Sequence, residues 1–296
     1  MVKIGIFMDI LTSTKTDYNR WASDKLGSYT NNINNLMVEI RNPLKLSKSE
    51  KDKCFKILKS QNMVFFNIGK PQKNIGFSLQ ELARQFGMGD YELDSQSNET
   101  GLTKIQVETN KDHGEYIPYT NKPLNWHTDG YYNALDRKIK GMVLHCVSPA
   151  AKGGESALMD PEMAYILLRD ENPDYIDALM RVDVMKIPAN IENNNIIREA
   201  QNGPVFSLCD EKKYLHMRYT GRSHSVKWKN DRTATAAVEF LSEVLKSDSP
   251  YIHKHVFSGG EGVLSNNVLH KRAGFEDDTQ RQRIFLRARY LDRIVI

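Results

Sequence analysis

The sequence lacks several features that would assign a class of protein directly. Three cysteines occur, Cys54, Cys146 and Cys209, and they form no C-x-x-C pair, so neither a disulfide framework nor a thiolate metal site is indicated. The 41 Lys and Arg against 37 Asp and Glu leave a net charge of +4 over 296 residues. That charge is too small to indicate a nucleic-acid partner or an anionic membrane, and it fits a small anionic ligand equally well.

Long hydrophobic runs are missing too. The apolar stretch at residues 1–11 is interrupted by Asp9, and no small-residue cleavage site follows it. No run approaches the roughly 18 apolar residues of a membrane span. No repeat or low-complexity linker occurs either. We therefore expect a cytoplasmic protein with a small-molecule partner and without a membrane or nucleic-acid partner, for which a homo-oligomer is possible.

The first third of the chain carries signals for both helices and strands. Ser47 and Glu50 form a capping box that predicts a helix. Ser78 and Glu81 form a second box, which predicts a short helix ending at Gly87. Apolar stretches on both sides of the first helix predict strands. We expect this third to be mixed α and β.

From about residue 105 onward the chain becomes rich in predicted strands. Asp160 before Pro161, and Asn172 before Pro173, predict two helices that interrupt them. The remaining predicted elements are a hairpin at 204–219, a helix at about 233–247 and strands at 138–147, 253–257, 262–269 and 283–290. Strands interrupted by a few helices favour a barrel or jelly roll over a doubly wound sheet.

These elements predict one domain over residues 1–296 with a mixed, mainly β fold. An α/β portion at 1–104 is expected to pack on a jelly-roll core at 105–296. That core carries a helical insertion at about 160–182 and a further helix at about 233–247.

A candidate metal site begins in the segment Asn125-Trp-His-Thr-Asp129. His127 and Asp129 are two residues apart, so in an extended segment both side chains leave the same face and can share one ion. A third ligand must come from elsewhere, and His270 follows a predicted apolar strand. Two His and one carboxylate leave positions open for a co-substrate and oxygen, as in iron(II) oxygenases. The histidines that compete for the third position are His113, His145, His216, His224, His253 and His255.

The predicted strand at 283–290 alternates between two kinds of side chain. One face carries Arg283, Phe285, Arg287 and Arg289, and the other carries Ile284, Leu286 and Ala288. If a helix covers the apolar face, the arginine face lines a cavity, where a guanidinium can bind a carboxylate through two hydrogen bonds. The alternative is an edge strand with its arginines in solvent.

Together these patterns resemble the TauD/TfdA (taurine dioxygenase-like) family of Fe(II)- and 2-oxoglutarate-dependent dioxygenases. The motifs are Trp126-His-Thr-Asp129, Gly153-Gly-Glu-Ser156, Asn266-Asn-Val-Leu-His270 and Arg283-Ile-Phe-Leu-Arg287, in the family's order and approximate spacing. The match covers roughly residues 125–292. The resemblance implies a double-stranded β-helix, or jelly-roll, core.

The resemblance also implies the ligands and the residues that bind them. Iron(II) is expected on the catalytic residues His127, Asp129 and His270, with 2-oxoglutarate and O2 as co-substrates. Ser156 and Arg283 are expected to bind the distal carboxylate of 2-oxoglutarate, although the neighbouring arginines leave this assignment open by one step of the strand.

The substrate side is less specified. The resemblance places Arg287 toward the primary substrate, where it can hold a sulfonate or carboxylate, and Tyr131 and Asn125 are further candidates. The implied reaction is hydroxylation of a small anionic or zwitterionic compound with release of succinate and CO2. The carboxylate of Asp129 favours hydroxylation over halogenation, because the related halogenases lack this ligand.

Two other functions fit the same residues. A non-catalytic jelly-roll protein would bind a ligand and release no succinate. A zinc-dependent hydrolase would use the same His/Asp/His site and would need a general base, for which Glu155 is the nearest candidate. Tyrosines around the His-x-Asp segment, among them Tyr131, either cage a quaternary ammonium group or pack in the interior.

Overall fold

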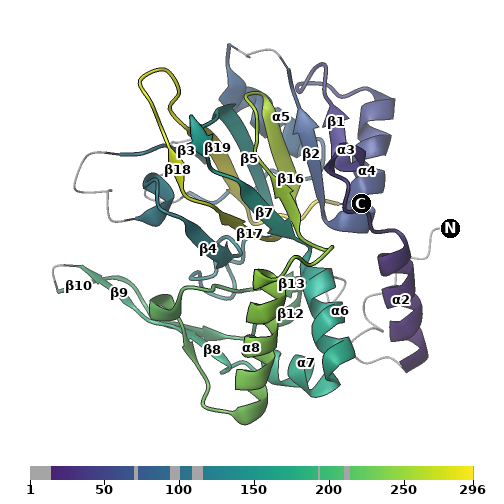
Figure 1. The fold of residues 1–296 in the computed structure, drawn as a ribbon, viewed down its shortest axis with the longest axis vertical. Coiled ribbons are helices and arrows are strands. Elements are labelled where there is room, and N and C mark those ends of the chain that lie inside the picture. Colours follow the sequence, from purple (N-terminus) through teal and green to yellow (C-terminus); the bar gives the residue numbers. More distant parts are fainter. Residues whose placement is uncertain are drawn as a thin grey trace.

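A computed structural model describes residues 15–69, 73–93, 101–108, 116–192, 194–209 and 214–295. Its largest element is a six-stranded sheet, seen in the upper half of Figure 1. The strands in spatial order are β1 (Met37–Glu39), β2 (Met63–Asn67), β16 (Glu261–Ser265), β5 (Gly141–Ser148), β19 (Ile284–Tyr290) and β3 (Leu102–Ile105). β1 and β2 are parallel, whereas the other neighbours in this sheet are antiparallel.

A second, antiparallel sheet carries the segment with the His-x-Asp motif. Its strands in spatial order are β15 (His253–His255), β7 (Ser156–Met159), β17 (Leu269–Arg272) and β4 (Leu124–His127). A cavity is lined by side chains of both sheets, including Leu144 and Phe285 from the large sheet and Leu158 from the second. The arginine-bearing strand β19 lies between β5 and β3 in the large sheet, so it is not an edge strand.

Short strands complete the β structure. They are β12 (Phe206–Cys209) with β13 (Tyr214–Met217), β8 (Met185–Ile187) with β11 (Gln201–Gly203) and β14 (Lys227–Trp228), β9 (Asn190–Glu192) with β10 (Asn195–Arg198), and β6 (Lys152–Gly153) with β18 (Phe275–Glu276). The pairing of β12 with β13 confirms the arms of the predicted hairpin. Its turn at 210–213 lies outside the described residues, as does the apolar stretch at 1–11.

Helices flank both sheets (Figure 1). They are α2 (Lys15–Gly27), α3 (Ile33–Leu36), α4 (Lys48–Gln61), α5 (Ile75–Arg84), α6 (Pro161–Glu171), α7 (Pro173–Leu179) and α8 (Arg232–Lys246), with 3-10 turns at Ile117–Tyr119 and Ser223–Ser225. Apolar side chains of α4 and α5 join those of the large sheet in one buried cluster, and α6, α7 and α8 share a second cluster with residues of the second sheet. No helix in the described part of the chain is long and apolar enough to span a membrane.

Three helix starts follow from local hydrogen bonding, as predicted. Ser47 and Glu50 form both bonds of a capping box at α4. Asp160 and Asn172 cap α6 and α7, and each is followed by a proline at the first helical position. These capping side chains satisfy amide groups that no earlier turn of the helix can reach.

Two predicted boundaries are wrong. The helix α5 begins at Ile75 because the side chain of Asn74 accepts a bond from Phe77 N, so Ser78 lies inside the helix and does not cap it. The strand predicted at 262–269 is two strands in different sheets, since Asn267 has a φ of 50°, in the left-handed region. An extended strand cannot pass through that conformation, which Asn tolerates better than most residues.

Candidate metal centre

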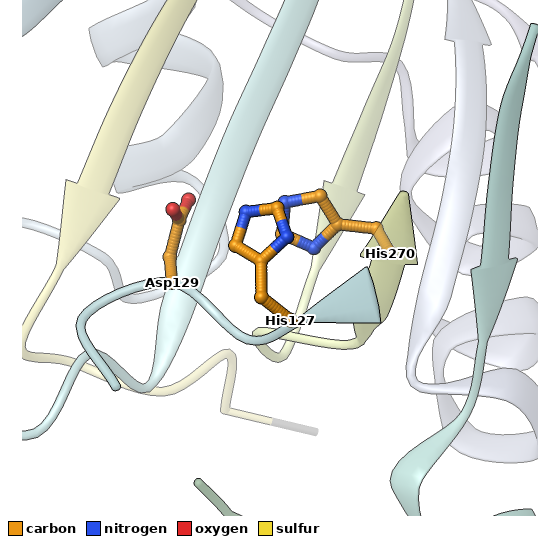
Figure 2. Close-up of side chains that lie close together, drawn as sticks. All are labelled: His127, Asp129 and His270. Carbon is orange, nitrogen blue, oxygen red and sulfur yellow. The ribbon is translucent and has the colours of Figure 1, made fainter. Parts of the chain in front are cut away.

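His127 and His270 face each other across two paired strands. His127 is the last residue of β4, and β17 places His270 directly opposite it in register. Their ring centroids are 4.2 Å apart. In Figure 2 the two imidazole rings lie next to each other, and the Asp129 carboxylate points to the same side of its segment as the His127 ring. Residues far apart in the sequence thus become neighbours through antiparallel pairing.

Asp129 joins the two histidines, as the spacing of two residues predicted. Thr128 between them is buried and exchanges hydrogen bonds with the backbone of Tyr219, so it points away from the ligand side. One ligand atom each from His127, Asp129 and His270 lies within 4.8 Å of the others. In the described residues this is the one group of His, Cys, Asp and Glu close enough to hold a metal ion.

The hydrogen bonds fix which imidazole nitrogen is available. Nδ1 of His127 bonds the carbonyl of Asn125 at 2.8 Å, and Nδ1 of His270 bonds the carbonyl of Val268 at 2.9 Å. A carbonyl only accepts, so each Nδ1 carries the proton and each Nε2 keeps a free lone pair. Burial, together with neighbouring His270, lowers the pKa of His127 to about 3, which keeps it neutral.

The Asp129 carboxylate is charged, and one of its two oxygens has a hydrogen-bond partner. Burial opposes its charge, but Arg287 and, to a smaller extent, His270, Arg289 and His127 together outweigh that effect and hold its pKa below the usual range. Arg287 Nη1 donates to Oδ1 at 3.0 Å. Oδ2 is buried and has no partner among the described residues. An unpartnered buried oxygen beside two free imidazole lone pairs is a site that fits a divalent metal.

Arg283 gives the adjoining cavity an uncompensated positive charge. Its side chain is buried, its guanidinium lies 3.9 Å from the Phe285 ring centroid, and no described carboxylate forms a salt bridge with it. Burial, with a contribution from Arg272, lowers its pKa to about 9. Ser156 is buried and lines the same cavity. A buried cation that forms no salt bridge favours an anionic ligand at this end of the cavity.

The residues expected on the substrate side have different surroundings. Tyr131 is buried and meets His127 edge-on, with ring centroids 6.5 Å apart. Arg287 lines the cavity but is bonded to Asp129, whereas the Asn125 side chain is exposed. Glu155, the base expected of a hydrolase, is exposed and does not line the cavity.

The competing histidines do not join this group. His145, His216 and His253 are buried elsewhere, and burial is the main cause that lowers the pKa of each. His224 is exposed, and His255 bonds Glu261 at 2.9 Å. His113 lies outside the described residues.

Asn267, whose side chain holds the backbone of Asp129, has no role that the sequence predicted. Its Oδ1 accepts from Asp129 N at 2.8 Å, and its Nδ2 donates to Asp129 O at 2.9 Å. The only signal was its place in the Asn266-Asn-Val-Leu-His270 motif, three residues before a metal-ligand candidate.

The model of the taurine catabolism dioxygenase TauD, TfdA family matches residues 29–289. The chain belongs to the TauD/TfdA family. A uridine-5'-phosphate dioxygenase from Streptomyces sp is 30% identical in an alignment over 199 residues that covers 64% of this chain and 69% of that protein. As a member of the TauD/TfdA family, the protein is a 2-oxoglutarate-dependent non-haem iron dioxygenase that uses O2.

Solved structures of TauD/TfdA-like oxygenases share the fold. The non-heme iron oxygenase OrfP, in complex with Fe and alpha-ketoglutaric acid, superimposes with a TM-score of 0.63 at 14% identity, covering 94% of this chain and 92% of that one. A putative alpha-ketoglutarate-dependent taurine dioxygenase from Burkholderia xenovorans gives 0.59 at 16% identity, covering 86% and 88%. The predicted mainly β architecture with helical insertions is therefore confirmed at the level of the fold.

Proposed function

We propose that this dioxygenase hydroxylates a small anionic organic substrate, with release of succinate and CO2, at an iron centre held by His127, Asp129 and His270. The observation that carries the proposal is this group, with its ligand atoms within 4.8 Å and both imidazole Nδ1 atoms already bonded to carbonyls. The two alternatives, a non-catalytic binding protein and a zinc hydrolase, have no comparable support, because family membership favours the dioxygenase and Glu155 does not line the cavity.

The co-substrate is proposed to bind in the cavity beside the metal ligands. Bound iron(II) and 2-oxoglutarate, together with O2 as the oxidant, would supply the oxidation of an unactivated C–H bond. Arg283 would pair with the distal carboxylate of 2-oxoglutarate, and Ser156 would donate its hydroxyl to the same group. Leu158, Phe257 and Phe285 line the cavity and would exclude water around this ion pair.

The proposed preference for an anion rests on the charges near Tyr131. Arg218 is buried, and its Nε donates to the Tyr131 carbonyl at 2.6 Å. Arg198 lies 5.5 Å from the Tyr132 ring and bonds backbone carbonyls, among them Pro188 O at 3.0 Å. No described carboxylate forms a salt bridge with either arginine. Such a surplus of positive charge beside the metal centre favours an anionic substrate over a betaine with its exposed cation.

A nucleoside 5'-phosphate is the first substrate to test. The Streptomyces relative is named for uridine 5'-phosphate, and such a molecule combines an anion with an aromatic ring. Tyr131 and Tyr132 meet edge to face at 5.2 Å, and this pair is proposed to supply the aromatic contact for the base. The substrate proposal thus assigns the phosphate to arginines and the base to this tyrosine pair.

The metal and co-substrate assignment is tested by spectroscopy. Metal-free protein mixed anaerobically with iron(II) and 2-oxoglutarate should develop a visible metal-to-ligand charge-transfer band. The variants His127→Ala and His270→Ala should lose it, whereas His224→Ala, which removes an exposed histidine, should keep it. Folded wild-type protein that shows no band would refute the proposed site.

The substrate proposal is tested by 2-oxoglutarate turnover. Uridine 5'-phosphate should accelerate succinate formation, and uridine, which lacks the anion, should do so far less. Taurine, a betaine and free amino acids serve as comparison compounds. Acceleration by the uncharged nucleoside equal to that by the nucleotide would argue against recognition of an anion.

A further inference from the structure

We propose that Asn267 and Arg287 are positioning residues that fix Asp129 in its ligand geometry before the metal binds. The inference rests on the proposed metal site and goes beyond it, because the family motifs in the sequence do not indicate that Asn267 or Arg287 contacts Asp129. Asn267 acts on the backbone of Asp129, and Arg287 acts on its carboxylate.

Asp129 needs such support because it does not lie within a strand. β4 ends at His127, and the chain turns immediately after Asp129 at Gly130, which has a φ of 65°. A side chain on a Cβ there would meet Ile139 at 2.4 Å, so the turn lies tightly against a neighbouring segment. A residue next to a tight turn has no strand partner on this side to hold its N–H and C=O groups.

Asn267 supplies both missing partners. Its amide accepts from Asp129 N at 2.8 Å and donates to Asp129 O at 2.9 Å, as the backbone of a paired strand would. Nδ2 also donates to Ile139 O at 2.7 Å. The side chain is buried, and Asn267 lies three residues before His270. One amide therefore joins the turn of Asp129 to the segment that leads into His270.

Arg287 fixes the rotation of the carboxylate. It reaches Asp129 from β19 in the large sheet and bonds Oδ1 at 3.0 Å. Oδ2 then points to the free side, where it has no described partner. Because one oxygen is held, the carboxylate is presented to a metal through the other, in one orientation. Side chains that hold a ligand in this way are expected to contribute strongly to metal affinity.

The test compares two asparagines that both have a positive φ. Asn267 has a φ of 50° and Asn62 a φ of 55°, both are buried, and Asn62 also bonds three groups, from Asp160, Asn266 and Arg293. Glycine adopts positive φ freely, so Asn267→Gly and Asn62→Gly each remove a side chain without straining the backbone. Asn62 touches none of the three metal-ligand candidates, which makes Asn62→Gly the matched control.

The measurement is the dissociation constant for Mn(II) in metal-free protein, with the unfolding temperature recorded for each variant. Asn267→Gly and Arg287→Met should weaken Mn(II) binding by about 10- to 100-fold. Arg287→Lys, which keeps a cation, should lose less than Arg287→Met. Asn62→Gly should lower the unfolding temperature and keep the wild-type Mn(II) affinity.

Three other results would contradict either the positioning role or the metal site. Wild-type affinity in both Asn267→Gly and Arg287→Met would reject the positioning role while leaving the metal site intact. A loss in Asn62→Gly equal to that in Asn267→Gly would reject it too, since general loosening would explain both. Wild-type protein that binds no Mn(II) would reject the metal site itself. If Asn267→Gly does not fold, the Mn(II) affinities of Arg287→Met and Arg287→Lys test the positioning role on their own.

Discussion

At the scale of single residues, the site combines atoms that are already satisfied with atoms that are not. The imidazole Nδ1 atoms and Asp129 Oδ1 have protein partners, whereas Asp129 Oδ2 and the charge of Arg283 have none among the described side chains. Leaving a buried oxygen and a buried cation uncompensated costs stability in the ligand-free protein. Bound ligands would recover that cost, so ligand binding and stability should be linked.

Arg283→Met tests this link. Binding of 2-oxoglutarate should weaken at least about 30-fold, because a desolvated charge pair is lost. The ligand-free variant should unfold at a temperature no lower than the wild type, since an unpaired buried charge has been removed. Differential scanning calorimetry with and without 2-oxoglutarate and Mn(II) measures both effects.

The control for Arg283→Met is Arg281→Met. Arg281 precedes Arg283 by two residues, and its side chain is 60% exposed, so its loss should alter neither 2-oxoglutarate binding nor unfolding. Equal stabilisation of the Arg283→Met variant and the wild type by 2-oxoglutarate would show that Arg283 does not bind the co-substrate.

At the scale of elements, helix starts were predictable where the signal was local. The caps at Ser47, Asp160 and Asn172 were identified because the capping side chain and its amide partner are two or three residues apart. The start of α5 was missed because two polar residues compete for the role. Asn74 caps the helix, and the hydroxyl of Ser78 bonds back to Asn74 O at 3.2 Å.

Alanine substitutions distinguish the two candidate caps of α5. Asn74→Ala should lower the free energy of unfolding by about 1 kcal/mol, because Phe77 N loses its partner at the helix start. Ser78→Ala should cost less, since Asn74 O keeps its bond from the backbone of Ser78. Urea denaturation measures both changes. A larger loss for Ser78→Ala would restore the original prediction of the helix start.

Strands were harder to predict than helices for a physical reason. Alternation shows which side chains share a face, and it placed Arg283 and Arg287 toward the cavity. It does not say which strand lies alongside or which acid an arginine meets, because those depend on pairing across long sequence separations. Local patterns therefore could not predict the Arg287–Asp129 ion pair, or that the strand expected at 262–269 is divided into two strands at Asn267.

At the scale of the whole molecule, buried histidines make stability depend on pH. Burial lowers the pKa of His145 to about 4, of His253 to about 4 and of His216 to about 3. These residues stay neutral when folded, whereas in the unfolded chain they take up protons near pH 6.5. The unfolded state thus binds more protons below that pH, and stability falls as the pH decreases toward 4.

His145→Phe should make this pH dependence shallower. His145 stacks on Phe66 in the large sheet, with centroids 6.0 Å apart, so phenylalanine retains the packing and removes the proton site. Chemical denaturation of metal-free protein at pH 7, 6 and 5 measures the slope. An unchanged slope would show that His145 is not neutral in the folded state.

The pairing of β4 with β17 has a consequence for how the protein is made. The ribosome delivers His127 and Asp129 long before His270, and the strand carrying Arg287 follows later still. Until β17 and β19 have left the exit tunnel, the nascent polypeptide holds two of the three proposed iron ligands and lacks the arginine proposed to orient the carboxylate. Loading of the metal therefore belongs after translation of this region, and truncated translation products should not compete with the finished enzyme for cellular iron.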